Sequence, residues 1–103
     1  MQFSSPKENF HDLHTVIKEV VIKNRHGLHA RPAALFVKTA QQFQAEISVE
    51  KEGELVNGKS IMGLMMLAAA KDSRLRLLAQ GKEADAALTA LEELINHGFG
   101  EEL

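Results

Sequence analysis

The stretch that decides the fold is Asn24-Arg25-His26-Gly27-Leu28-His29-Ala30-Arg31-Pro32-Ala33-Ala34. A run of Val and Ile that is typical of a strand ends just before it, and an amphipathic run that is typical of a helix begins just after it. Pro32 suits the first turn of a helix, because the N–H that proline lacks would have no partner there. Side chains at this junction are therefore expected at a helix N-terminus, where free backbone N–H groups attract anions.

Hydrophobic periodicity on both sides of this stretch predicts seven elements in the order β-α-β-β-α-β-α. Four strands are predicted, at residues 15–22, 45–50, 54–57 and 74–79, and three helices, at residues 32–43, from 60 to about 69, and from about 83 to 96. The second and third strands form a hairpin around Gly53. Three helices on one face of a four-stranded, mostly antiparallel sheet make a two-layer plait, whose other face meets solvent.

Each predicted helix has an inner apolar side. The first has Ala33, Phe36, Val37, Ala40 and Phe43 at helical spacing, and the last has Ala84, Ala87, Leu88, Leu91 and Ile95. The short middle helix is apolar on two sides, with Leu64 and Leu67 on one and Ile61, Met62 and Met65 on the other. A short helix in so small a domain buries only one of them, so the second is a candidate contact patch, for which methionine is well suited. Residues 99–103 are expected to be frayed.

Length and composition indicate one small domain and exclude several functions. The chain has 103 residues, no cysteine and a formal net charge of −2. Disulfides and thiol chemistry are therefore excluded, and nucleic-acid binding is not expected. No signal peptide is recognisable, and the longest apolar run, residues 61–70, is too short to span a membrane. We expect a cytoplasmic, monomeric domain over residues 15–103.

Residues 1–14 are polar and have no sustained hydrophobic period, so the sequence predicts a flexible N-terminal leader there. His11 and His14 are three positions apart in this leader and would share a helical face. Two histidines without a third ligand are a weak metal signal, and we expect no metal site.

His29 is the candidate for chemistry at the central stretch. An unprotonated imidazole is a nucleophile near neutral pH, and the positive end of a helix dipole disfavours the imidazolium. A phosphoryl group on His29 would meet the free N–H groups of the helix start, and Arg31 would add a forked, charge-assisted contact. His26 lies farther from the helix and is interpreted as a loop residue, while Arg25 adds only positive potential.

Two motifs resemble those of the HPr family of phosphocarrier proteins. Residues Gly27-Leu28-His29-Ala30-Arg31-Pro32-Ala33 are similar to its active-site signature. Residues Asn57-Gly58-Lys59-Ser60-Ile61-Met62-Gly63-Leu64 are similar to its regulatory-serine motif, and the 31-residue spacing of His29 and Ser60 also matches. The resemblance covers residues 15 to 95 and implies an α+β fold, the open-faced β-sandwich, with strand order 1-4-2-3.

The resemblance also implies a function in the phosphoenolpyruvate-dependent phosphotransferase system. Enzyme I would phosphorylate Nδ1 of His29, and the group would pass to IIA domains or proteins of sugar transport. Arg31 would stabilise the phosphoryl charge, and Ala30 and Pro32 would support its binding site at the helix start. Ser60 corresponds to a serine that an HPr kinase/phosphorylase modifies in some bacteria. The chain would be a carrier without a cofactor and not an enzyme in its own right.

The patch formed by Ile61, Met62 and Met65 is expected to dock these partners. We further expect both helix starts to lie side by side, with Ser60 near His29, so that a phosphate on Ser60 would weaken docking. An ordinary helix N-cap is the other interpretation of Ser60.

Two other functions stay open at this point. A carrier of the nitrogen-related branch would pass phosphate to a regulatory IIA protein, and residues 95–99 are weakly similar to that branch. A regulatory binding module that never carries phosphate would use the same patch, but the presence of His29 and Arg31 argues against it.

Overall fold

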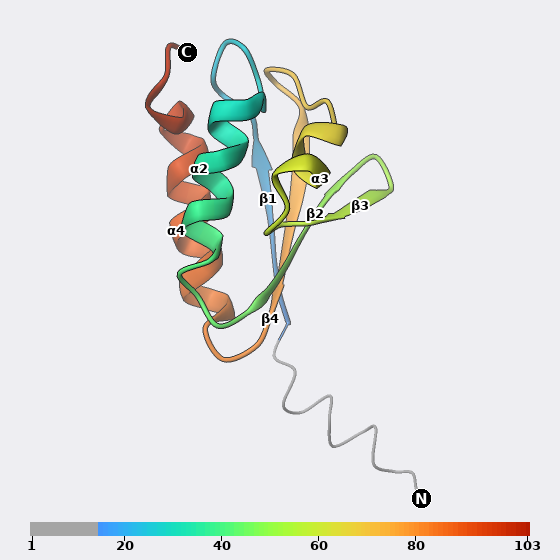
Figure 1. Ribbon diagram of the computed structural model, residues 1–103, viewed down its shortest axis with the longest axis vertical. Coiled ribbons are helices and arrows are strands. Elements are labelled where there is room, and N and C mark those ends of the chain that lie inside the picture. Colours follow the sequence, from blue (N-terminus) through green and yellow to red (C-terminus); the bar gives the residue numbers. More distant parts are fainter. Residues whose placement is uncertain (1–14) are drawn as a thin grey trace, which may run out of the picture.

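The computed structural model describes residues 15–103, and its centre is one four-stranded sheet (Figure 1). The strands are β1 (Thr15–Val21), β2 (Glu46–Lys51), β3 (Glu54–Asn57) and β4 (Arg74–Gln80), in the spatial order β1-β4-β2-β3. Every neighbouring pair is antiparallel. The predicted strand order 1-4-2-3 is therefore confirmed.

Three helices cover one face of this sheet (Figure 1). They are α2 (Ala30–Ala40), α3 (Ile61–Met66) and α4 (Ala84–Asn96), and a short 3-10 turn, η1 (Gly98–Gly100), follows. The open-faced α+β arrangement and the order β-α-β-β-α-β-α are thus confirmed. Three helix boundaries differ from the prediction by two residues or more, and one of them is the end of α2, at Ala40 and not at Phe43. The helix α2 begins two residues before Pro32, and α3 ends at Met66 because Ala68 adopts a left-handed φ of 51°.

The core lies between the sheet and the helices. Alternation in the strands buries Val20, Leu75, Leu77, Ile47 and Val49 toward the helices, while their neighbours face the other side. The predicted inner sides of α2 and α4 pack on them, with Phe36, Leu88 and Leu91 almost fully buried. On the open face, Ile17 and Leu55 stay more than half exposed.

The C-terminal residues contradict the prediction of a frayed end. Gly98, Phe99 and Gly100 have φ values of 63°, 56° and 74°, so three consecutive residues are left-handed and reverse the chain after α4. Phe99 is 2% exposed and belongs to the core. This anchor returns residues 101–103 to the loop before α2. Burial of one aromatic side chain thus holds in place an end whose sequence is otherwise polar and rich in glycine.

The predicted leader of residues 1–14, with His11 and His14, lies outside the described residues. From Thr15 onward no helix is long and apolar enough to cross a membrane.

Candidate functional site

His29 is the N-cap residue of α2 and has an extended backbone, with φ −86° and ψ −169°. Its carbonyl oxygen accepts the first bond of the helix, from the Ala33 N–H at 2.9 Å. Its imidazole makes no capping bond, so the ring is available for other contacts. The N–H groups of Ala30 and Arg31 have no partner within the helix, and they lie at the positive end of its dipole.

The loop before His29 is held against the segment that follows α3. The Leu28 N–H donates to the Ala69 carbonyl at 2.8 Å. Gly27 has a φ of +72°, and a Cβ at this position would lie 2.4 Å from the same carbonyl oxygen. Asn24 is buried and donates from Nδ2 to the Gly27 carbonyl at 2.7 Å. The loop therefore needs glycine at position 27, and its course fixes the position of His29.

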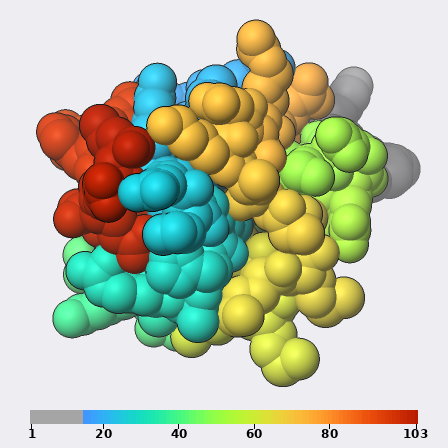
Figure 2. Space-filling model, turned by 90° about the horizontal axis from the view of Figure 1, so that it is seen from above, coloured from blue at the N-terminus to red at the C-terminus, as the bar shows by residue number. Residues whose placement is uncertain are grey.

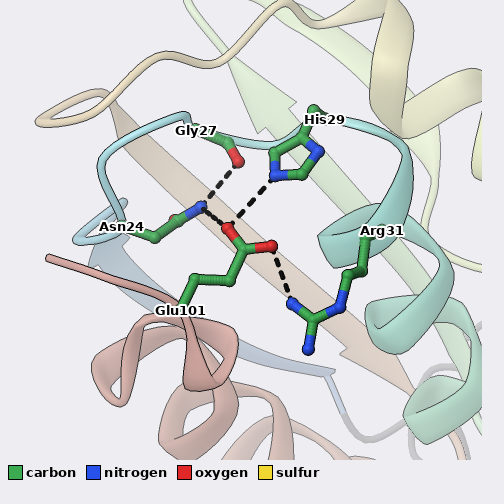
Figure 3. A network of polar contacts seen from close by, with 5 residues as sticks. All are labelled: Asn24, Gly27, His29, Arg31 and Glu101. Atoms are coloured by element: carbon green, nitrogen blue, oxygen red, sulfur yellow. Dashed lines mark hydrogen bonds and ion pairs between the residues drawn. The ribbon is translucent and has the colours of Figure 1, made fainter.

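Glu101 completes the site from the other end of the chain (Figure 3). Its Oε1 lies 3.1 Å from His29 Nε2 and accepts from Asn24 Nδ2 at 3.0 Å. Its Oε2 accepts from Arg31 at 2.7 Å. The Glu101 side chain is only 14% exposed, and Figure 2 shows the C-terminal residues packed against the loop before α2. Three side chains from one short stretch thus converge on one carboxylate.

This arrangement sets the chemistry of the His29 ring. An ionised carboxylate only accepts hydrogen bonds, so the His29 nitrogen that faces it, Nε2, carries the hydrogen. In a neutral imidazole the other nitrogen, Nδ1, then holds a free lone pair. The contact with Glu101 therefore leaves Nδ1, and not Nε2, as the ring nitrogen that is free to form another bond.

The pKa of Glu101 reflects this network. Burial raises the pKa of the carboxyl, but hydrogen bonds from His29, Arg31 and Asn24 outweigh it and hold the pKa below the ordinary value of 4.5. Ionised Glu101 is therefore favoured in the folded chain.

The lowered pKa of Glu101 can be tested by acid titration. Because its folded pKa is lowered, the Glu101 contacts stabilise the docked C-terminus fully above the ordinary value and lose this effect as pH falls through the lowered pKa. We expect the 13C signal of the Glu101 carboxyl to titrate below pH 4.5. In Arg31→Met the midpoint should rise toward that value, and an unchanged midpoint would contradict the network.

Two other loop residues contact this site. The rings of His26 and His29 lie edge to face, with centroids 6.3 Å apart. The Arg25 backbone N–H donates to the Glu102 carbonyl at 2.9 Å, and its guanidinium lies 3.5 Å from the Glu102 carboxylate. Arg25 thus does more than the predicted addition of positive potential, because it also holds the C-terminal residues in place.

Ser60 is the N-cap of α3, and its Oγ accepts from the Gly63 N–H at 2.9 Å. The helices α2 and α3 pack against each other, and the expectation that their starts lie side by side, with Ser60 near His29, stays a prediction. Ala69, beyond the C-terminal end of α3, contacts the His29 loop, while α3 begins lower, near the hairpin (Figure 1).

The predicted contact patch lies on the exposed side of α3. Ile61, Met62 and Met65 are 42%, 74% and 43% exposed, whereas Leu64 and Leu67 are buried. Met66, which was not predicted to belong to this patch, is 66% exposed and extends the same surface. We call these four residues the α3 patch.

Sequence reasoning missed Glu101 and gave Asn24 no role. Neither carries a local signal, because a Glu near a chain end and an Asn in a loop are both common in exposed segments. Residues 15–103 contain no group of three or more His, Asp or Glu side chains placed to hold a metal ion.

Comparisons with known proteins agree with this geometry. Residues 16–97 match a family described as "PTS HPr component phosphorylation site". The "Phosphocarrier protein HPr" of Neisseria meningitidis serogroup A is 50% identical over 84 residues, covering 82% of this chain and 94% of that protein. The "Multiphosphoryl transfer protein" of Salmonella typhimurium is 44% identical over 86 residues, or 81% of this chain and 23% of that protein. A crystal structure of HPr from Thermoanaerobacter tengcongensis has a TM-score of 0.82 and 49% identity, and covers 85% of this chain and 99% of that one.

Proposed function

This chain belongs to the HPr family, the phosphocarrier proteins of the phosphotransferase system, and we propose that it carries the phosphoryl group on Nδ1 of His29. Phospho-Enzyme I would be the donor, and IIA domains or proteins of sugar transport the acceptors. The observation that carries the proposal is the position of His29, whose Nε2 is held by Glu101 at the start of α2. No other histidine among residues 15–103 combines a helix start, a carboxylate partner and a neighbouring arginine.

The proposed step is a transfer between two nitrogens. The Nδ1 lone pair of His29 attacks the phosphorus atom on the donor, the P–N bond to the donor histidine breaks, and a P–N bond to Nδ1 forms. The Nε2–H stays on the ring, held by Glu101. Attack by a nucleophile of the IIA acceptor reverses this bond change, so His29 is regenerated.

The phosphoryl oxygens would bind at the start of α2. The N–H groups of Ala30 and Arg31 are free to donate there, and the small side chain of Ala30 leaves them accessible. Pro32 is buried and has no N–H, so it fixes the first turn without competing for the anion. The Arg31 side chain is 61% exposed and already paired with Glu101. Its remaining guanidinium N–H groups would donate to the phosphoryl oxygens.

The α3 patch is the proposed docking surface for Enzyme I and the IIA proteins. Three methionines and Ile61 offer an adaptable apolar surface, which suits a carrier that must bind several partners. As a carrier, the chain would act as a cytoplasmic monomer and would not be an enzyme in its own right.

Ser60 is the proposed regulatory site, for an HPr kinase/phosphorylase. Its hydroxyl caps α3, whose next residues, Ile61 and Met62, begin the α3 patch. A phosphate there would place about −1.5 to −2 charges beside this apolar surface. This charge would act on docking through the α3 patch.

Ser60→Asp should therefore weaken docking to Enzyme I. We expect the KM for this carrier to rise about tenfold, with the maximal rate nearly unchanged, because an uncompensated charge enters an apolar interface. The matched control is Ser60→Asn, which keeps a capping oxygen without the charge and should behave like the wild type. Equal KM values for the Asp and Asn variants would contradict this role of Ser60.

The proposal is tested by incubating the chain with Enzyme I and labelled phosphoenolpyruvate. One acid-labile phosphate per chain is expected, with a 31P signal typical of Nδ1-phosphohistidine. Absence of label would favour a regulatory module that carries no phosphate. The labelled chain is then mixed with a sugar-transport IIA domain or with a nitrogen-related IIA protein. Which of the two takes up the phosphate decides between the sugar and the nitrogen-related branch.

A further inference from the structure

Asn24 is a buried polar side chain to which the proposed transfer assigns no part. Its exposure is 0%, and its Oδ1 has no hydrogen-bond partner among residues 15–103. An unpaired acceptor in the interior costs free energy, so packing alone would favour an apolar side chain at this position. The presence of an amide there therefore needs another reason.

The reason lies in the two hydrogens of Asn24 Nδ2. This nitrogen donates to the Gly27 carbonyl at 2.7 Å and to Glu101 Oε1 at 3.0 Å (Figure 3). Turning the amide over would direct Oδ1 at the same two acceptors, so the network fixes its orientation. Leucine and aspartate have nearly the same shape, but leucine has no donor, and an aspartate carboxylate only accepts and would repel Glu101.

Both of these hydrogen bonds lead to His29. The Gly27 carbonyl also accepts from the His29 backbone N–H at 3.0 Å, and Glu101 Oε1 also lies 3.1 Å from His29 Nε2. The backbone and the ring of His29 are thus each connected to the same buried amide through one intervening group. A hydrogen-bonded partner behind a functional side chain fixes the orientation of that side chain.

The other charged partner of Glu101, Arg31, is less suited to hold the carboxylate during transfer. The Arg31 side chain is 61% exposed and would share its N–H groups with the phosphoryl oxygens, which weakens its hold on Oε2. Asn24 is buried and both of its donor bonds go to groups of the folded chain. It therefore holds Oε1 beside Nε2 whether or not a phosphoryl group is present.

We propose that Asn24 is a positioning residue for the transfer. Through Glu101 it keeps the Nε2–H of His29 in place while Nδ1 accepts and releases the phosphoryl group. No bond to Asn24 forms or breaks, and its amide loses no proton. This role rests on the proposed function of His29, which supplies the reaction.

Single-turnover transfer from phospho-Enzyme I tests this role in the full chain. Asn24→Ala should slow the maximal transfer rate about tenfold, as for other groups behind a functional side chain. The chain concentration that gives half of this rate should change by less than about twofold, because the substitution leaves the α3 patch intact.

The decisive comparison repeats Asn24→Ala in a Glu101→Ala background. Since Asn24 acts through Glu101, the added loss there should be less than about twofold. An equal loss in both backgrounds would show that Asn24 only shapes the loop, and an unchanged rate in Asn24→Ala alone would show that it does not affect the transfer. Either result overturns the proposal.

Two controls separate positioning from general stability. Val49→Ala weakens the core at β2, away from the site, and should leave the transfer rate within about twofold of the wild type. Asn24→Ser keeps one donor and replaces Asn24→Ala in each comparison if the alanine variant does not fold.

A titration without Enzyme I keeps this test independent of the proposed function. In unphosphorylated Asn24→Ala, the pKa of the Glu101 carboxyl should move toward the ordinary value of 4.5, because one donor to the carboxylate is lost. An unchanged midpoint would overturn the hold of Asn24 on Glu101. Absence of phosphate on the wild type would instead overturn the function of His29, so the two failures are distinguishable.

Discussion

His29→Ala is expected to take no acid-labile phosphate from Enzyme I and phosphoenolpyruvate. The proposed transfer needs a lone pair on an imidazole nitrogen at the start of α2, and alanine offers none. No other group replaces it, since Arg31 is always protonated and Glu101 faces His29 Nε2 and not the incoming group. The loss should be complete, because the residue forms the bond to phosphorus itself.

His26→Ala is the matched control for this loss. Among residues 15–103, His26 is the histidine nearest to the site, with its ring 6.3 Å from that of His29, and it too is exposed to solvent. Its removal should leave labelling within about threefold of the wild type and stability within about 0.5 kcal/mol, as for most surface substitutions. Label that remains on His29→Ala, or that disappears in His26→Ala, would assign the phosphoryl group to a different residue.

Much of the fold could be predicted because its signals are local. Alternation in β2 and β4 places Ile47, Val49, Leu75 and Leu77 in the core, and helical spacing does the same for α2 and α4. The position of His29 at a helix start also follows from neighbouring residues. Helix ends were less accurate, since Ala68 ends α3 by a left-handed φ that its sequence does not require.

The rest of the site could not be predicted, because it depends on contacts between distant residues. Glu101 lies 72 positions from His29, and no local period links the two. Its approach depends on the left-handed turn at residues 98–100, of which only the two glycines are visible in the sequence. The direction of α3 does not follow from its sequence either, because a capping motif fixes only where the helix begins.

Glu101 gives the unphosphorylated site an anion of its own. Arg31 and the His29 Nε2–H are both satisfied by this carboxylate, so the two side chains are already oriented for the proposed transfer. The same carboxylate would compete with a phosphoryl group for Arg31 once the group is bound. Glu101 can orient the site only if the C-terminal residues stay docked beside the loop before α2. We expect the buried side chain of Phe99 to keep them docked.

Phe99→Ala should produce the largest loss of stability in the C-terminal residues. Phe99 is 2% exposed in the core, so its truncation is expected to lower the free energy of unfolding by about 3–5 kcal/mol. That is a large part of the stability of a small domain, about 5–15 kcal/mol. Both residues have a Cβ, so the strain of φ 56° is the same in each and cancels in the comparison.

Two measurements check this prediction. Urea unfolding of Phe99→Ala gives the change in free energy, and Leu103→Ala, at a side chain 64% exposed, is the control, expected within about 0.5 kcal/mol of the wild type. In the folded Phe99→Ala chain, the Glu101 carboxyl should titrate closer to its ordinary value, because a loosened turn no longer holds it against Arg31 and His29. A stable variant with the wild-type Glu101 titration would mean that Arg25 and Glu102, and not Phe99, hold the C-terminal residues on the site.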